Sequence, residues 1–195
     1  MELRGDFSRM LPRLRQGRLQ QELLVKAARI KGAEAPTAVD CTAGLGEDSL
    51  LLAAAGFTVT LFERDQTIAA LLADALERAA ADPRLAEAVG RMTLVTGDSV
   101  AGLAALPEPP DVVYLDPMFP ARTKSAAVKK KFQLLHHLEQ PCEEEEALVA
   151  AALAAYPRKV VIKRPAKGGL LAGIKPSYSV GGKAVRYDVL VPPRS

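Results

Sequence analysis

A short turn at residues 116–120 has the residue types needed to hold a planar amino group. Asp116-Pro117-Met118-Phe119-Pro120 follows Val112-Val113-Tyr114-Leu115, an apolar, β-branched and aromatic run that predicts a buried strand. Proline fixes φ, lacks an N–H donor and pushes the residue before it toward an extended backbone. We therefore expect the Asp116 carboxylate and the Pro117 carbonyl to present two fixed acceptors to one amino group.

Two such acceptors suit the methylation of an exocyclic base amine, which is a poor nucleophile because its lone pair is delocalised into the ring. Hydrogen bonds from both N–H groups favour a pyramidal nitrogen and direct its lone pair at an activated methyl group. Phe119 can stack on the target base. The turn thus predicts Asp116, Pro117 and Phe119 as catalytic residues. The alternative is that Asp-Pro only starts a turn and that Phe119 belongs to the core.

A glycine-containing loop near the amino terminus predicts the methyl-donor site. Asp40-Cys41-Thr42-Ala43-Gly44-Leu45-Gly46-Glu47-Asp48 follows an expected strand, and its glycines allow a tight turn and a close approach to a ligand. Glu63 ends the next expected strand about 20 residues later, the usual distance for a carboxylate that holds ribose hydroxyls. Ser49 replaces the third glycine of the dinucleotide fingerprint, so the loop favours S-adenosylmethionine (SAM) over a nicotinamide cofactor.

Further polar and basic residues follow the other expected strands. Asp98-Ser99 is placed either to meet the adenine edge of the donor or to cap the next helix. Basic side chains after the turn and at the fifth strand can track RNA phosphates, although a solvated helix face is an alternative for the first four. These predicted RNA-binding residues are Lys124, Lys129, Lys130, Lys131, Lys163 and Arg164.

Apolar runs and helical periods alternate along the chain, which predicts an α/β fold. The expected strands cover residues 37–41, 57–62, 92–95, 112–115 and 160–162, and the expected helices between them cover 47–55, 66–80 and 100–106. We also expect a helix at 18–31 closed by Gly32, and another that starts in the acidic run 143–146. Strands at 178–180 and 185–191, joined by Gly181-Gly182, predict a terminal hairpin. The expected architecture is the class I methyltransferase (Rossmann-like) fold, a mostly parallel seven-stranded sheet with a C-terminal antiparallel hairpin.

Composition predicts one soluble globular domain, since 49% of the 195 residues are apolar and 25% are charged. We expect a methyltransferase domain at 33–195 after a short basic arm and helix at 1–32. Eight Lys or Arg against three acidic residues before Gly32 suggest an anionic partner such as RNA, or a solvated terminus. The chain has no candidate membrane span or signal peptide, which predicts a cytoplasmic protein, and its two cysteines predict neither a disulfide framework nor a metal site.

The sequence resembles the RsmJ family of bacterial 16S ribosomal RNA guanine-N2 methyltransferases. The resemblance rests on residues 40–49, Phe62-Glu63-Arg64, Tyr114 through Pro120, residues 124–130 and Val161-Ile162-Lys163-Arg164-Pro165, and it runs from about Arg18 to Asp188. It implies SAM as the donor and a guanosine of 16S rRNA, free or in the small ribosomal subunit, as the acceptor. The donor-contacting residues that it implies are Glu47, Asp48, Glu63, Arg64, Asp98, Ser99 and Asp116, beside Asp40, Gly44 and Gly46 of the loop.

Two departures from the family pattern bear on this interpretation. The family typically has a basic residue where this chain has Glu47, and it usually has a longer amino-terminal region. Two other functions remain open: methylation of another amine, in DNA or on a protein glutamine, and a non-catalytic RNA-binding or ribosome-assembly role. The presence of both Asp116 and Glu63 argues against the second.

Overall fold

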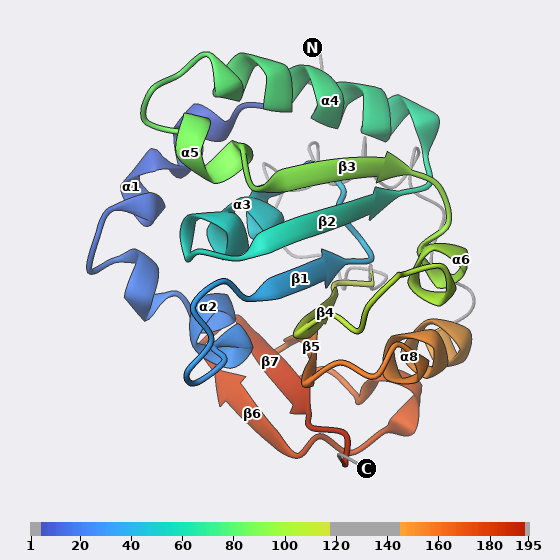
Figure 1. The fold of residues 1–195 in the computed structure, drawn as a ribbon. Coiled ribbons are helices and arrows are strands. Elements are labelled where there is room, and N and C mark those ends of the chain that lie inside the picture. Colours follow the sequence, from blue (N-terminus) through green and yellow to red (C-terminus); the bar gives the residue numbers. More distant parts are fainter. Residues whose placement is uncertain (1–4, 118–144, 194–195) are drawn as a thin grey trace.

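The computed structural model describes residues 5–117 and 145–193, in which seven strands form one sheet in the order β3-β2-β1-β4-β5-β7-β6 (Figure 1). The parallel strands are β1 (Thr37–Asp40), β2 (Thr58–Glu63), β3 (Met92–Thr96), β4 (Val112–Leu115) and β5 (Lys159–Pro165). β7 (Val185–Leu190) is antiparallel to β5 and to β6 (Tyr178–Gly181). The predicted mostly parallel seven-stranded sheet with a terminal antiparallel hairpin is confirmed.

Helices pack on both faces of this sheet over two separate apolar cores. One core contains side chains of α2 (Leu23–Ala28), α3 (Glu47–Ala54), α4 (Gln66–Ala80) and α5 (Ala86–Val89). The other contains side chains of α6 (Ser99–Ala104) and α8 (Glu145–Ala154). The central strand β4 is buried along its whole length, as its continuous apolar run predicts for a strand covered on both faces.

The longer regular elements agree with the sequence-based expectations. The helix at 66–80 and the strand at 112–115 have the predicted bounds, and the other predicted strands and the helices at 47–55 and 100–106 differ by a few residues at their ends. Asp65 caps α4, because its Oδ1 accepts the N–H groups of Thr67 and Ile68 at 2.8 and 3.0 Å. α8 lies where the acidic run predicts a helix, and the short α5 was not predicted.

The predicted helix at 18–31 is wrong in its extent. The structure has a short 3-10 turn, η2 (Leu19–Gln21), then α2, and the two are separated at Glu22, whose ψ is 129°. Glu22 forms a two-point ion pair with Arg13, through distances of 2.9 and 2.7 Å, and this tertiary contact accompanies the break. α2 ends at Ala28, before Gly32. Lys159 donates to the carbonyl of Ala27, in the last turn of α2, and to that of Arg29, just after the helix.

The segment before α2 packs against the rest of the molecule. It contains η1 (Phe7–Met10) and α1 (Leu11–Leu14), and Phe7 and Met10 are only 2% and 4% exposed in the core that also contains α3 and α4. Gly46 has a φ of 75°, and a Cβ there would lie 2.7 Å from Leu72 and 3.2 Å from Phe7. The amino-terminal segment therefore supports the underside of the loop that precedes α3. The domain boundary at residue 32 stays a prediction.

Arg186 of β7 organises the segment that follows β5. Its Nη1 donates to the carbonyls of Pro165, Ala166 and Gly168 at 2.9, 3.1 and 2.8 Å, and its Nη2 donates to Gly169 at 3.3 Å. Asp188 Oδ1 accepts the Nε–H of the same guanidinium at 2.9 Å. One side chain thus fixes the backbone path of 165–169.

Among the helices of residues 5–117 and 145–193, none has the length and the apolar composition that a membrane span requires.

Candidate active site

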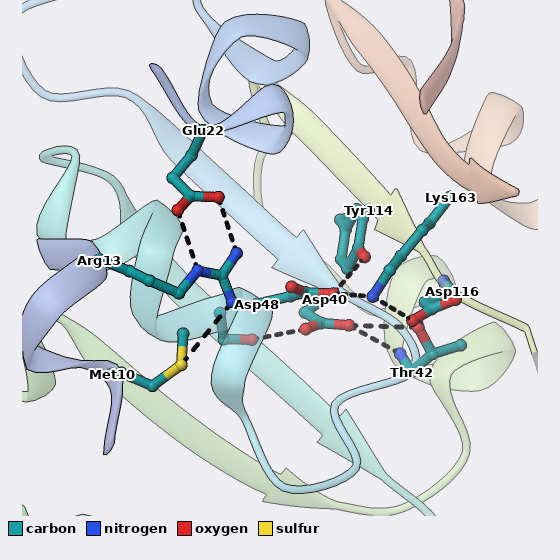
Figure 2. A network of polar contacts seen from close by, with 10 residues as sticks. Met10, Arg13, Glu22, Asp40, Thr42, Asp48, Tyr114, Asp116 and Lys163 are labelled. Atoms are coloured by element: carbon teal, nitrogen blue, oxygen red, sulfur yellow. Dashed lines mark hydrogen bonds and ion pairs between the residues drawn. The ribbon is translucent and has the colours of Figure 1, made fainter. Parts of the chain in front are cut away.

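The carboxyl ends of four parallel strands bring polar side chains together at one edge of the sheet. Asp40 ends β1, Glu63 ends β2, Asp116 follows β4 and Lys163 lies near the end of β5. Asp48, in the first turn of α3, completes this group, and Figure 2 shows it with Asp40, Asp116 and Lys163. Ligands of open α/β sheets bind at this edge, so the predicted donor loop and the predicted catalytic turn meet where a shared site is expected.

Asp40 is the most buried carboxylate of the group, at 1% exposure. Its Oδ1 accepts the N–H of Thr42 at 2.9 Å, and its Oδ2 accepts the hydroxyl of Ser49. Burial raises the pKa of Asp40 to about 7 despite these hydrogen bonds, and the nearby carboxylates of Asp48 and Asp116 raise it further. Asp40 thus holds the loop and the start of α3 together from inside, and its predicted donor contact stays a prediction.

Glu63 joins the end of β2 to the same loop. Its Oε2 accepts the N–H of Gly44 at 2.9 Å and its Oε1 accepts the N–H of Asp65 at 2.8 Å. Burial raises the pKa of Glu63, while these hydrogen bonds lower it. Each carboxylate oxygen can accept a second hydrogen bond, so Glu63 can receive ribose hydroxyls while it keeps both backbone contacts.

Asp116 is held both through its backbone and through its side chain. Its N–H donates to the Thr42 hydroxyl at 2.7 Å, which connects the end of β4 to the donor loop. The Lys163 ammonium donates to Asp116 Oδ2 at 2.9 Å and to Asp48 Oδ2 at 2.6 Å. Tyr114 donates its hydroxyl to the same Asp48 oxygen at 2.6 Å. These four side chains form one connected polar network at the sheet edge (Figure 2).

The charges of this network act on each other. Burial raises the pKa of Asp116, the Lys163 ammonium lowers it and Asp48 raises it. Burial alone would lower the pKa of Lys163, but Asp48 and Asp116 together raise it well above its ordinary value. Lys163 is therefore a permanent cation between two carboxylates.

The remaining predicted donor residues surround this group. Asp98 is exposed at the end of β3, and its Oδ1 accepts the N–H of Ala101 at 2.9 Å, so it caps α6. Ser99 begins α6, Glu47 begins α3 half-buried, and Arg64 is exposed after β2. The capping role of Asp98 is thus present, and its contact with adenine stays a prediction.

The predicted RNA-binding residues fall into different places. Lys163 belongs to the polar network, whereas Arg164, next to it on β5, is 5% exposed and donates its Nε to the Gly169 carbonyl at 2.8 Å. Successive side chains of a strand point to opposite faces, so the structure does not bring these two together. Phe119, Lys124, Lys129, Lys130 and Lys131 lie outside the described residues.

Sequence reasoning missed Tyr114 of the network. It also missed Thr42, which contacts Asp116 and Asp40, and Ser49, which contacts Asp40. Lys163 was predicted only as an RNA contact. One signal was available for Lys163: β4 and β5 pair in parallel with Leu115 opposite Ile162, so the polar residue that follows each apolar run reaches the same point. Tyr114 of β4 lies two residues before Asp116, which follows directly after the strand, and this spacing places both on one face.

Comparison with known proteins assigns the chain to a family. Residues 2–192 match the family model described as "Putative SAM-dependent methyltransferase". A ribosomal RNA small subunit methyltransferase J from Thioalkalivibrio sulfidiphilus is 50% identical over 89% of this chain and 69% of the relative. A protein of the same name from Aeromonas salmonicida is 48% identical over 86% of this chain and 68% of the relative. The chain belongs to the methyltransferase J family.

Solved structures agree with this assignment. A SAM-dependent methyltransferase from Neisseria gonorrhoeae is 35% identical, with a TM-score of 0.79 over 98% of this chain and 75% of that protein. An rRNA methyltransferase from Streptomyces viridochromogenes, 17% identical with a TM-score of 0.57 over 89% of this chain and 84% of that one, shares the fold. The chain spans between 65% and 69% of the length of several methyltransferase J relatives.

As a methyltransferase J member, the chain is a SAM-dependent methyltransferase, and its residues fit that cofactor. The Gly44 to Gly46 turn leads directly into α3, and Glu63 offers hydroxyl acceptors beside it. An exposed carboxylate, Asp98, follows the neighbouring strand β3. In the described residues no group of acidic, histidine or cysteine side chains has the arrangement of a metal site.

Proposed function

We propose that this chain transfers a methyl group from SAM to the exocyclic N2 amine of a guanosine in 16S rRNA, in the cytoplasm. The names of its relatives support small-subunit rRNA as the acceptor. The observation that carries the proposal is the half-buried Asp116 carboxylate, which lies at the end of β4 beside the donor loop and is linked to it through Thr42.

The donor is held by residues at the ends of the first three strands. Glu63 receives ribose hydroxyls, and Asp98 with Ser99 lies beside the adenine. The loop and helix residues that complete this site are Asp40, Gly44, Gly46, Glu47, Asp48 and Arg64. When bound, SAM supplies a methyl group that its positively charged sulfur activates toward a nucleophile.

The acceptor amine is held by Asp116 and the Pro117 carbonyl, with Phe119 stacked on the base. Their hydrogen bonds concentrate the lone pair on the amine nitrogen and aim it at the methyl carbon. Methyl transfer to this nitrogen would leave S-adenosylhomocysteine as the product. The nitrogen then releases one proton, which the Asp116 carboxylate can accept because burial raises its pKa.

RNA binding is assigned to the lysines that follow this turn, which are Lys124, Lys129, Lys130 and Lys131. The sequence also predicts phosphate contacts at Lys163 and Arg164 of β5, but Lys163 lies in the polar network beside Asp116 and Arg164 is only 5% exposed. Such contacts position an RNA without reading its sequence, so the choice of nucleotide depends on the base site.

A methyl-mapping experiment tests the proposal. The purified chain is incubated with methyl-labelled SAM and with small ribosomal subunits, or protein-free 16S rRNA, from cells that lack this protein. Mass spectrometry of the digested nucleosides is expected to place the label on the N2 amine of guanosine. Asp116→Asn is expected to reduce transfer about 100-fold or more, because an amide cannot stabilise the charge that develops on the amine.

Asp82→Asn is the matched control, since Asp82 is a carboxylate outside the polar network whose side chain, within the described residues, pairs with Arg84 alone. It should retain wild-type transfer. Label in DNA or on a protein glutamine would select the alternative amine substrates. Tight RNA binding without any transfer would support a ribosome-assembly role instead.

A further inference from the structure

The Lys163 ammonium is shared between two carboxylates that come from different elements. It lies 2.9 Å from Asp116 Oδ2, after β4, and 2.6 Å from Asp48 Oδ2, in the first turn of α3. Tyr114 donates to the same Asp48 oxygen. The side chains of Lys163, Asp48 and Asp116 are 25%, 16% and 35% exposed, so water screens the three charges only in part.

Stability alone does not explain this arrangement. Two carboxylates around one cation leave a net negative charge in a half-buried place, which costs free energy relative to a single ion pair or to apolar packing. Charged groups that are held together at such a cost inside a binding site are candidates for a role in the reaction. The charge of Asp116 at this position is therefore a candidate for such a role.

We propose that Lys163 is a positioning residue for methyl transfer, which keeps the Asp116 carboxylate ionised and turned so that one oxygen faces the acceptor amine. This inference rests on the proposed function, in which Asp116 holds that amine. It assigns Lys163 a role inside the site, whereas the sequence predicted only a contact with RNA phosphate.

The first part of this role is electrostatic. Burial and the Asp48 carboxylate both favour the neutral form of Asp116, and a neutral carboxyl group would accept the amine N–H less strongly. Lys163 opposes both effects and lowers the pKa of Asp116. Lys163 itself stays charged, because its two carboxylate neighbours raise its pKa.

The second part is geometric. Lys163 donates to Oδ2 of Asp116, and Thr42 accepts the Asp116 backbone N–H, so the residue is held at its backbone and at one carboxylate oxygen. Oδ1 of Asp116 has no hydrogen-bond partner within the described part of the chain, and it remains able to accept an amine N–H. Asp48 in turn fixes the ammonium and Tyr114 fixes Asp48, because Lys163 and Tyr114 both donate to Oδ2 of Asp48.

Several other groups face this network and must be considered when pH is varied. The charged or titratable groups that interact with Asp116 or with its partners are Lys163, Asp48, Asp40, Tyr114, Tyr187 and Arg13. Burial raises the pKa of Tyr114 and of Tyr187, so both stay neutral in the assay range. Asp40, with a pKa of about 7, also titrates within that range, and Asp48→Asn lowers its pKa because the Asp48 carboxylate raises it. The carbon-13 signal of Asp116 itself, described below, therefore decides whether a shifted profile belongs to Asp116.

The pH dependence of kcat, measured at saturating donor and RNA, tests the proposal through two substitutions with opposite effects. Lys163→Met removes the cation and should move the acidic limb to higher pH, with about tenfold lower kcat at any pH on that limb for each unit of displacement. Asp48→Asn removes the competing carboxylate and should move the acidic limb to lower pH. Lys163→Arg keeps the charge and should restore the wild-type limb.

Lys175→Met is the matched control, because Lys175 is an exposed lysine just before β6 and outside the polar network. It should leave the profile unchanged. Filter binding of the RNA separates the alternative role: Lys163→Met should bind RNA with wild-type affinity. Weaker RNA binding with an unshifted pH profile would overturn the proposal and make Lys163 a phosphate contact.

Carbon-13 NMR titration of the aspartate carboxylates separates this inference from the proposed function, because it needs no substrate. The Asp116 signal, assigned by its loss in Asp116→Asn, should titrate at higher pH in Lys163→Met and at lower pH in Asp48→Asn. If the wild-type protein fails to methylate rRNA, this titration still tests whether Lys163 lowers the pKa of Asp116. An Asp116 signal that titrates identically in the folded wild type and both variants would refute the inference.

Discussion

Asp40 is a carboxylate that folding encloses almost completely, and its environment sets a pH dependence of stability. Its pKa rises from 3.8 to about 7, mainly because burial penalises the charged form. Between these two values the folded state keeps a proton that the unfolded state has lost, so this group makes the free energy of unfolding fall as pH rises. The free-energy cost of charging the buried Asp40 carboxylate is fully present only once the pH is well above its folded-state pKa of about 7.

Asp40→Asn should remove that dependence. The amide oxygen can accept the Thr42 N–H and the amide nitrogen can donate to Ser49, so the contacts survive. In urea unfolding, we expect the variant to match the wild type near pH 4 and to be more stable near pH 8 by on the order of a few kcal/mol. Parallel curves for the two proteins would show that Asp40 is already charged in the folded state.

Glu63 offers a second test at the level of one residue. Glu63→Gln keeps the shape but replaces one acceptor oxygen with a donor, so one of the N–H groups of Gly44 and Asp65 loses its partner. Calorimetry should show at least about tenfold weaker binding of S-adenosylhomocysteine, since hydrogen bonds to charged groups contribute about 1.5–3 kcal/mol. Glu87→Gln, at a glutamate whose side chain is 85% exposed and pairs with Arg91, should bind normally.

For single residues, the sequence predicted where the functional side chains lie better than it predicted which residues contact them. Glu63 and Asp116 stand where the sheet ends, as their place after apolar runs predicts. Their partners could not be predicted, because the Thr42 contact with Asp116 spans 74 residues and the Asp48 contact with Lys163 spans 115. Such contacts depend on how strands from distant parts of the chain are ordered in the sheet.

Among the elements, α6 shows how one residue can have two roles. Asp98 caps the helix by accepting the N–H of Ala101, and it is also the predicted contact for adenine. Asp98→Ala should lower the free energy of unfolding by about 1 kcal/mol, whereas Asp98→Ser should retain most of the capping. Both variants should weaken S-adenosylhomocysteine binding, as measured by calorimetry. Unchanged affinity for S-adenosylhomocysteine in both variants would mean that Asp98 caps α6 and does not contact the adenine.

Elements with a strong local signal were predictable, and those fixed by tertiary contacts were not. α4 has a capping Asp65 and a long apolar face, and both of its ends were predicted. The segment 18–31 has a helical period as well, but the pairing of Glu22 with Arg13 and the short α2 depend on packing against other parts of the chain. Periodicity carries no information about such contacts.

On the scale of the whole molecule, the amino-terminal segment is part of the main core. Phe7 is 2% exposed and lies under Gly46 of the donor loop. Phe7→Ala should lower the free energy of unfolding of the protein by about 3 kcal/mol, because it empties a packed site. Thermal or urea unfolding should show one cooperative transition at a lower midpoint.

Tyr156→Ala is the matched aromatic control, since Tyr156 is 79% exposed, and it should change stability by less than about 0.5 kcal/mol. An unchanged main transition in Phe7→Ala would mean that residues 1–32 form an independent arm, as the domain division from sequence proposes. The mostly parallel direction of the strands and the antiparallel terminal hairpin, by contrast, followed from the alternation of apolar runs with helical periods and from the glycine turn of the hairpin.

Arg186 holds the segment after β5 through main-chain carbonyls, not through side chains. The path of that segment is therefore almost independent of which amino acids occupy it, except at Gly168, where a Cβ would lie 3.0 Å from Pro165. Ala166, Lys167 and Gly169 can change while the backbone keeps its course beside Lys163. A cysteine at one of these positions would carry a photocrosslinker at a fixed place next to the site, and so report which nucleotides come to rest there.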